Sequence, residues 1–206
     1  FGWINYDLIA SGEHKQQFNP FGGEERFWLG PEGGQYALYF NQGDSFSIEH
    51  WKVPPLIDTE PFELRDASAT SVTYGRSAVI ANYKGTQFQL DIERTISILY
   101  DSLADPWLAR EDRKDVDLVM YASENKITNT GAKDCNKADG LLSVWLLGMM
   151  TPSPETVVIM PFRPGPASRS GITDSYFGSV PADRLVIGDS LLYFRCDGRY
   201  RSKIGV

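Results

Sequence analysis

The sequence is poor in the residues that most often mark metal and redox sites. It contains two cysteines, Cys135 and Cys196, and two histidines, His14 and His50. Two cysteines are too few for a disulfide framework, and no cysteine and histidine spacing matches a zinc site. We therefore expect no metal and no cofactor. Cys135 falls in a polar loop and Cys196 at the end of an apolar strand, so we expect them to be unbonded.

Basic charge and long apolar runs are also scarce. The net charge is −7, which disfavours nucleic acid as a partner because phosphate binding needs a basic face. No apolar run approaches the roughly 18–20 residues needed to cross a bilayer. Phosphate-loop, dinucleotide-binding and nucleophile-elbow motifs are missing. The chain begins at Phe1 without a signal-like segment, so we expect a piece of a longer or processed protein.

Alternation of apolar and polar side chains is the main pattern that the sequence does have. It is clearest in residues 85–100, which we expect to form a hairpin with residues 71–80. The roughly ten-residue spacing of strands predicts one antiparallel all-β sandwich or barrel domain over residues 1–206. One short helix is predicted at 104–115, with Asp105 as its N-cap. Further strands are expected at 3–10, 46–51, 116–123, 141–150, 156–162, 184–188 and 190–196.

Two of these strands have unusual side chains. Residues 141–150 are apolar on both parities, as in a central strand covered on both faces or a buried helix, and the flanking strands favour a strand. Arg94 lies on the apolar parity of residues 85–100, where an unpaired charge is very costly. We expect it to pair with an acid from 24–32 or 58–63, the alternatives being a bulge or a solvent-filled cleft.

The stretch from Phe21 to Phe40 holds the first candidate ligand groups. Arg26 and Trp28 share one strand parity, opposite the apolar Phe27 and Leu29, and Glu32 follows the turn at Pro31. An indole can stack on the apolar face of a sugar while charged groups hydrogen-bond its hydroxyls. The alternative is an ordinary strand and turn with a surface Arg–Glu pair, worth ~0–1 kcal/mol.

His50 and Trp51 form the second candidate pair, at the end of a predicted strand. The prolines at positions 54 and 55 end that strand, and strand ends are frequent ligand sites. His50 can serve as a general acid, or it can be an edge-strand histidine with an ordinary hydrogen bond. We predict that one concave cleft is lined by Arg26, Trp28, Glu32, His50 and Trp51.

Several segments together resemble the galactose-mutarotase-like superfamily, which includes the aldose 1-epimerases, and an uncharacterised secreted bacterial branch within it. They are GGEERFWLGPEGG at 22–34, EHW-x-V-P at 49–54, IERTISIL at 92–99, ITNTG at 127–131 and LLSVWLLGMM at 141–150. The resemblance implies an antiparallel supersandwich with a sugar cleft, and a periplasmic or extracellular location.

The family's catalytic pair is a histidine acid and a glutamate base that comes late in the chain. This chain departs from that pattern, because His50 is its only counterpart to the family's histidine, and we expect the strand that would carry the late glutamate to be missing. Glu32 is the carboxylate that we place beside His50 as a catalytic candidate. Arg26, Trp28 and Trp51 are the corresponding candidates for substrate binding.

Three hypotheses follow. The first is an epimerase-like enzyme acting on an aldose or sugar derivative through Arg26, Glu32 and His50. The second is a non-catalytic carbohydrate-binding or structural module that uses Trp28 and Trp51. The third is a β-sandwich without a small-molecule site. The sequence leaves the sugar and the oligomeric state open.

Overall fold

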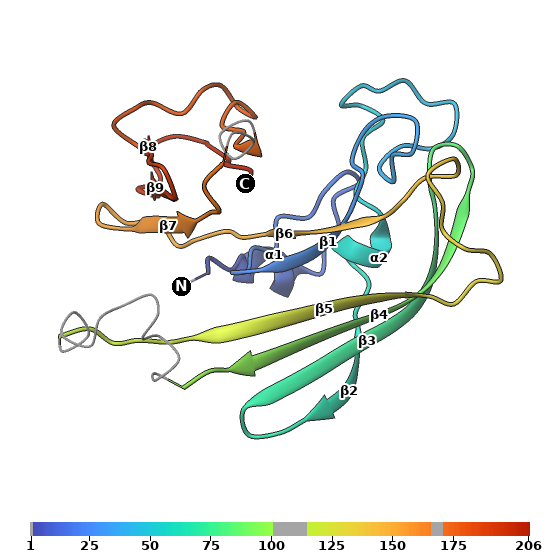
Figure 1. Ribbon diagram of the computed structural model, residues 1–206, viewed down its shortest axis with the longest axis horizontal. Coiled ribbons are helices and arrows are strands. Elements are labelled where there is room, and N and C mark those ends of the chain that lie inside the picture. The colour runs from blue at the N-terminus through green and yellow to red at the C-terminus, as the bar shows by residue number, and fades with distance from the viewer. Residues whose placement is uncertain (1, 101–114, 166–170) are drawn as a thin grey trace. The chain divides into compact units, whose positions relative to one another are not determined.

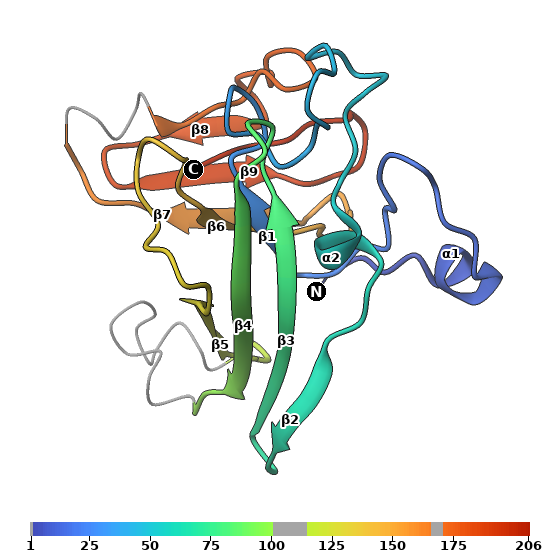
Figure 2. The ribbon, with the colours of Figure 1, turned by 90° about the vertical axis from the view of Figure 1, so that its right-hand side faces the viewer.

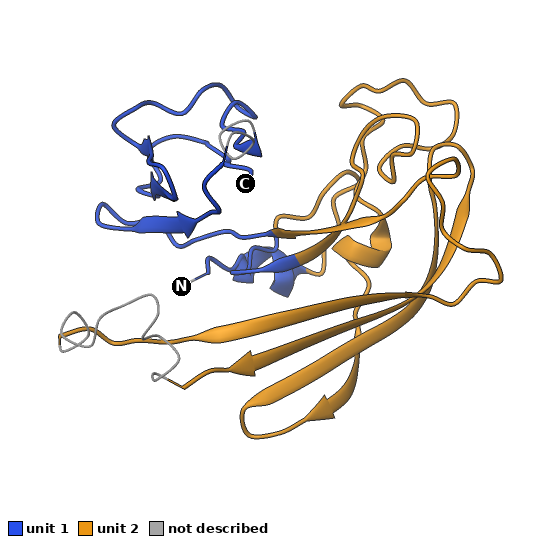
Figure 3. Cartoon of the chain, in the orientation of Figure 1, with its two compact units in different colours: residues 1–11, 21–26, 147–206 blue, residues 12–20, 27–146 orange. Residues whose placement is uncertain are grey.

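The computed structural model describes residues 2–100, 115–165 and 171–206, and these residues are built mainly from antiparallel β-sheets. The chain divides into two compact units (Figure 3). Unit 1 comprises residues 1–11, 21–26 and 147–206, and unit 2 comprises residues 12–20 and 27–146. The all-β prediction is confirmed. The helix predicted at 104–115 falls almost entirely outside the described residues.

A four-stranded antiparallel sheet dominates unit 2, and its strands lie side by side in Figures 1 and 2. Its order is β2 (Glu63–Ala67), β3 (Ser71–Ala81), β4 (Gln87–Ile98) and β5 (Tyr121–Asn129). The pairing of β3 with β4 runs without interruption from Ser71 opposite Ser97 to Ala81 opposite Gln87. The predicted hairpin is therefore confirmed.

The two faces of β4 differ as its alternating sequence predicts. Phe88, Leu90 and Ile92 are buried on one face, whereas the intervening Gln89 is exposed. Arg94 continues the buried face at 8% exposure, and its Nη1 donates to Oδ1 of Asn125 at 3.0 Å. Asn125 lies directly opposite on β5. The predicted burial of Arg94 is confirmed, and its pairing with an acid stays a prediction.

The opposite face of the same sheet is polar and centres on Arg65 of β2. Nη1 and Nη2 of Arg65 donate to the Asp91 carboxylate at 2.8 and 2.5 Å, and Ser77 Oγ donates to it at 3.0 Å. Glu93 lies 3.4 Å from Nη1. Arg65 crosses Gly75 so closely that a Cβ on Gly75 would overlap its side chain. Glycine at this position therefore makes room for the ion pair.

Strand β1 (Arg26–Gly30) pairs with β6 (Ser143–Leu147) in a separate two-stranded sheet. Phe27, Trp28 and Leu29 are all buried, at 8%, 2% and 0% exposure, so both parities of β1 are enclosed. Trp28, expected to offer its indole to a ligand on the face opposite Phe27 and Leu29, is therefore enclosed like them. Residues 141–150 contain a strand as predicted, but β6 itself is exposed or half-buried rather than covered on both faces.

Two predicted strands form other local structures, one a short helix and the other a turn. Residues 3–10 contain the helix α1 (Tyr6–Ser11), because Asn5 Oδ1 accepts the backbone N–H of Leu8 at 3.1 Å and acts as an N-cap. Residues 46–51 form a turn in which the carbonyl of Ser47 accepts the N–H groups of His50 and Trp51 at 3.1 and 3.2 Å. A second helix, α2, spans Pro55–Asp58. Residues 116–120 precede β5 without joining it.

Unit 1 contains a three-stranded antiparallel sheet with the order β7-β9-β8. Its strands are β7 (Val157–Pro161), β8 (Leu185–Ile187) and β9 (Leu191–Arg195), which confirms three predicted strands. A small core forms where Leu192, at 0% exposure, packs with Val180 and Leu185. Cys135 and Cys196 are both free, as predicted.

The Arg65–Asp91 pair makes the stability of unit 2 depend on pH in the acidic range. The hydrogen bonds from Arg65 lower the pKa of Asp91 to about 2, below the ordinary value of about 3.9 expected when unfolded. The stabilisation is therefore fully present above about pH 4 and is lost as the pH falls towards 2. We expect Arg65→Met to lower the free energy of unfolding at pH 7, with a difference from wild type that shrinks below about pH 4.

Urea titrations at several pH values measure this difference. Arg195→Met is the matched control, because Arg195 is an exposed strand arginine outside this network. A difference between wild type and Arg65→Met that stays constant from pH 7 to pH 2 contradicts the prediction.

Candidate functional site

Stacked and edge-on aromatic rings run through unit 2 from its core to a half-buried indole. Trp28 of β1 packs against Trp145 of β6 with ring centroids 4.9 Å apart, and against Phe18 at 5.6 Å. Trp28 also stacks on Tyr39 at 5.8 Å. Tyr39 in turn stacks on Trp51, with centroids 5.7 Å apart and planes inclined by 19°. The cluster therefore ends at Trp51.

Backbone and side-chain hydrogen bonds hold Tyr39 in this cluster. Its hydroxyl donates to the carbonyl of Leu29 at 2.8 Å, and its own carbonyl accepts the N–H of Lys52 at 2.9 Å. The N–H of Leu38 donates to the carbonyl of Pro31 at 3.0 Å, so residues 31–40 fold back on β1. Tyr39 is only 1% exposed. These contacts fix both Tyr39 and the backbone beside Trp51.

Glu32 lies at the rim of the Trp51 indole. Nε1 of Trp51 donates to Oε1 of Glu32 at 2.9 Å. Tyr39 stacks on the indole, yet Trp51 remains partly exposed and Glu32 is exposed. An ionised carboxylate accepts up to about four hydrogen bonds, so Glu32 can accept further donors. Glu32 and Trp51 together therefore offer an aromatic surface with a hydrogen-bond acceptor at its edge.

His50 precedes Trp51 but contacts the hydroxyls of its own turn. Its Nδ1 lies 2.9 Å from Ser45 Oγ and 3.3 Å from Ser47 Oγ, and the residue is exposed. In the same turn, a hydrogen bond from Ser47 lowers the pKa of the Glu49 carboxyl. Glu32, by contrast, pairs with Trp51. The catalytic roles of His50 and Glu32 stay predictions.

The other two predicted site residues, Trp28 and Arg26, lie in different surroundings. Trp28, predicted to bind substrate, is a core residue because Phe18, Tyr39 and Trp145 surround its ring. Arg26 is the last residue of a unit 1 segment, where its guanidinium lies 5.8 Å from the centroid of the Phe21 ring. Of the five predicted residues, the structure brings Glu32 and Trp51 into direct contact.

Tyr39 is a site residue that sequence reasoning missed. The signal was the aromatic run at positions 36, 39 and 40, which directly follows the glycine pair at 33 and 34. Such a run after a tight bend can return an aromatic ring to the preceding strand. Within the described ranges, no group of three or more His, Cys, Asp or Glu side chains could hold a metal ion.

Comparison with known proteins gives one match. The model of a family of unknown function, DUF6786, matches residues 1–206. The chain belongs to this family. The match includes residues of both compact units. Comparisons of this DUF6786 chain with the curated proteins and with the solved structures give no match. None of its helices in the described segments is long and apolar enough to span a membrane.

The Trp51–Glu32 hydrogen bond can be observed directly by NMR. We expect Glu32→Ala to shift one indole N–H resonance upfield among those of the five tryptophans, because the proton loses a charged acceptor. Trp51→Phe assigns the resonance by removing it. His50→Ala is the control, since the His50 ring contacts Ser45 and Ser47 instead. Unchanged indole resonances in Glu32→Ala contradict the contact.

Proposed function

We propose that this DUF6786 protein binds carbohydrate, with Trp51 as the stacking surface and Glu32 as a hydrogen-bond acceptor. The contact between Trp51 Nε1 and Glu32 Oε1 carries the proposal. A sugar ring has an apolar C–H face that packs on an aromatic ring and hydroxyls that donate to carboxylates. Small-molecule sites combine apolar and aromatic surface with a few well-placed polar groups in the same way.

The fixed position of Trp51 supports the proposal. Tyr39 is buried, stacks on the indole and is hydrogen-bonded to Leu29, so the stacking surface is set before a ligand arrives. Little conformational entropy is then lost when a sugar binds. An exposed tryptophan on a free loop would have to be ordered first.

A galactose-mutarotase-like supersandwich and a periplasmic or extracellular location belong to the same proposal. The four-stranded antiparallel sheet of unit 2 is compatible with such a fold. Within this proposal, catalysis as an aldose 1-epimerase-like enzyme would require His50 to act as the general acid. The alternative is a non-catalytic carbohydrate-binding or structural module. The contact between Trp51 and Glu32 favours binding as the common element of both.

Calorimetric titration with a panel of mono- and oligosaccharides tests binding. We expect Trp51→Ala to weaken binding by about tenfold or more, equivalent to a loss of ~1.4 kcal/mol. Trp3→Ala is the matched control, because Trp3 is 37% exposed and belongs to unit 1. If no sugar in the panel binds, or if both variants lose affinity equally, the proposal is rejected.

Polarimetry with freshly dissolved α-glucose or α-galactose separates the two forms of the proposal. An epimerase-like enzyme accelerates mutarotation above the buffer rate, and His50→Ala removes the acceleration while sugar binding remains. A protein that binds sugar in calorimetry yet leaves the rate at the buffer value is the non-catalytic module.

A further inference from the structure

The C-terminal part of unit 1 is basic, although the whole chain is acidic. Residues 195–203, RCDGRYRSK, carry four arginine or lysine side chains and one aspartate, whereas the chain has a net charge of −7. Arg199 and Arg201 are both exposed, with 76% of the Arg199 side chain accessible. The local charge is therefore opposite to that of the protein.

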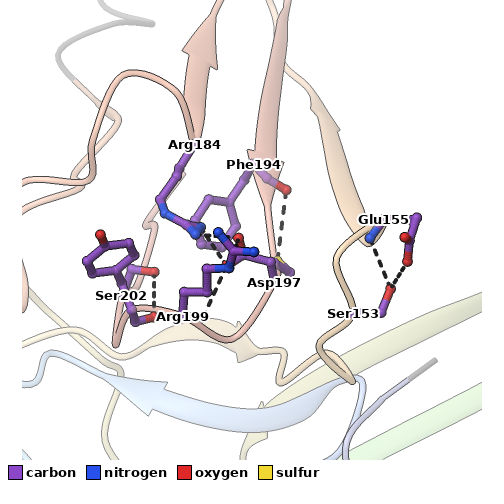
Figure 4. Close-up of polar contacts among 9 residues, drawn as sticks. Ser153, Glu155, Arg184, Phe194, Asp197, Arg199 and Ser202 are labelled. Carbon is purple, nitrogen blue, oxygen red and sulfur yellow. Dashed lines mark hydrogen bonds and ion pairs between the residues drawn. The ribbon is translucent and has the colours of Figure 1, made fainter.

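The one acid in this segment is already neutralised inside the fold. Asp197 accepts both Nη groups of Arg184, with Nη1 to Oδ1 at 2.5 Å, and both side chains are buried (Figure 4). Asp197 also accepts the backbone N–H of Arg199 at 3.1 Å, and the Arg199 Nε lies 3.8 Å away. Because this single aspartate faces both Arg184 and Arg199, the cations of the segment outnumber its acids.

Exposed aromatic rings alternate with these cations. The Arg201 guanidinium lies 4.1 Å from the centroid of the Phe177 ring, and Lys203 Nζ lies 4.4 Å from that of Tyr176. The Tyr200 ring stacks on the buried Arg184 at 4.5 Å and is 62% exposed. These side chains form the basic–aromatic surface: Tyr176, Phe177, Arg199, Tyr200, Arg201 and Lys203.

Backbone contacts hold the two segments of the basic–aromatic surface together. Thr173 and Gly205 exchange both N–H to carbonyl hydrogen bonds, at 2.9 and 2.8 Å. Tyr176 packs so closely on Gly205 that a Cβ there would lie 2.5 Å from its hydroxyl. The rings at 176 and 177 are therefore fixed beside the cations of the C-terminal segment.

We propose that the basic–aromatic surface binds an acidic polysaccharide, a sugar chain that carries carboxylates. Planar guanidinium groups such as those of Arg199 and Arg201 match carboxylates with two parallel hydrogen bonds. The exposed Tyr200 and Phe177 rings supply faces on which sugar rings stack. This surface belongs to unit 1 and its proposal does not depend on Trp51 of unit 2.

The sparse charge of such a polymer fits this surface better than nucleic acid does. Duplex DNA carries one negative charge per ~1.7 Å of axis, and an acidic protein is repelled by so dense an array. A polyuronate carries one carboxylate per sugar ring. The basic–aromatic surface has three cations among three aromatic rings, so it offers few charges and much ring surface, as a sparsely charged sugar chain requires.

Affinity electrophoresis and calorimetry of the full chain with polygalacturonate test the proposal. We expect retardation by polygalacturonate but not by neutral dextran. The double variant Arg199→Gln/Arg201→Gln should weaken binding by about tenfold or more, and log affinity should fall less steeply with log salt than in wild type, because fewer ionic contacts remain. The matched control is Lys133→Gln/Lys137→Gln, which removes the same charge from an exposed loop of unit 2.

Several results would overturn the proposal. They are no binding of polygalacturonate, equal binding of its fully methyl-esterified form, equal binding of duplex DNA, or an equal loss in the lysine control. Circular dichroism checks the fold of each variant, and Arg201→Gln alone replaces the double variant if that one unfolds. Under this proposal Trp51→Ala still binds polygalacturonate. Failure of the basic–aromatic surface proposal can therefore be told apart from failure of the Trp51 site proposal.

Discussion

The packing of aromatic rings around Trp28 is the contact on which the interior of unit 2 depends. Phe18, Tyr39 and Trp145 reach this ring from three separate parts of the chain. Large rings remove much apolar surface from water, and their edge-on and stacked contacts add to that gain. Trp28 is buried and cannot contact a ligand itself. It stacks on Tyr39, however, and Tyr39 stacks on Trp51. Core packing and the proposed sugar surface are therefore physically linked.

Both proposed binding surfaces follow the same physical plan. In unit 2 an exposed carboxylate accepts a hydrogen bond from Trp51, and buried Tyr39 supports that ring. In unit 1 the buried Arg184 supports the exposed Tyr200. In each case a ring offered to solvent is held by a side chain that is itself fixed in the interior. Aromatic surface so held loses little freedom on binding, which favours recognition of ring-shaped ligands.

The hairpin of β3 and β4 was predictable because a strand with one buried and one polar face has alternating apolar and polar residues in its sequence. Residues 3–10 alternate as well, yet Asn5 caps a helix there, so a single local hydrogen bond outweighed the pattern. Alternation along β1 did not predict the burial of Trp28, because the ring that covers it belongs to Trp145, which is distant in sequence. Of the five residues predicted to line one cleft, Glu32 and Trp51 are in contact, and the contacts of His50 with neighbouring serines left no signal in the pattern.

Gly75 has a consequence for how this family can vary. Its φ is not among the positive ones, so the backbone conformation there would accept residues other than glycine. The obstacle to a side chain is the overlying Arg65, which would have to leave Asp91. Substitution at position 75 is thus constrained by the Arg65 side chain of the neighbouring strand, which its ion pair with Asp91 holds over this position. A family member with a larger residue at 75 should carry compensating changes at 65 and 91, and these three positions should covary.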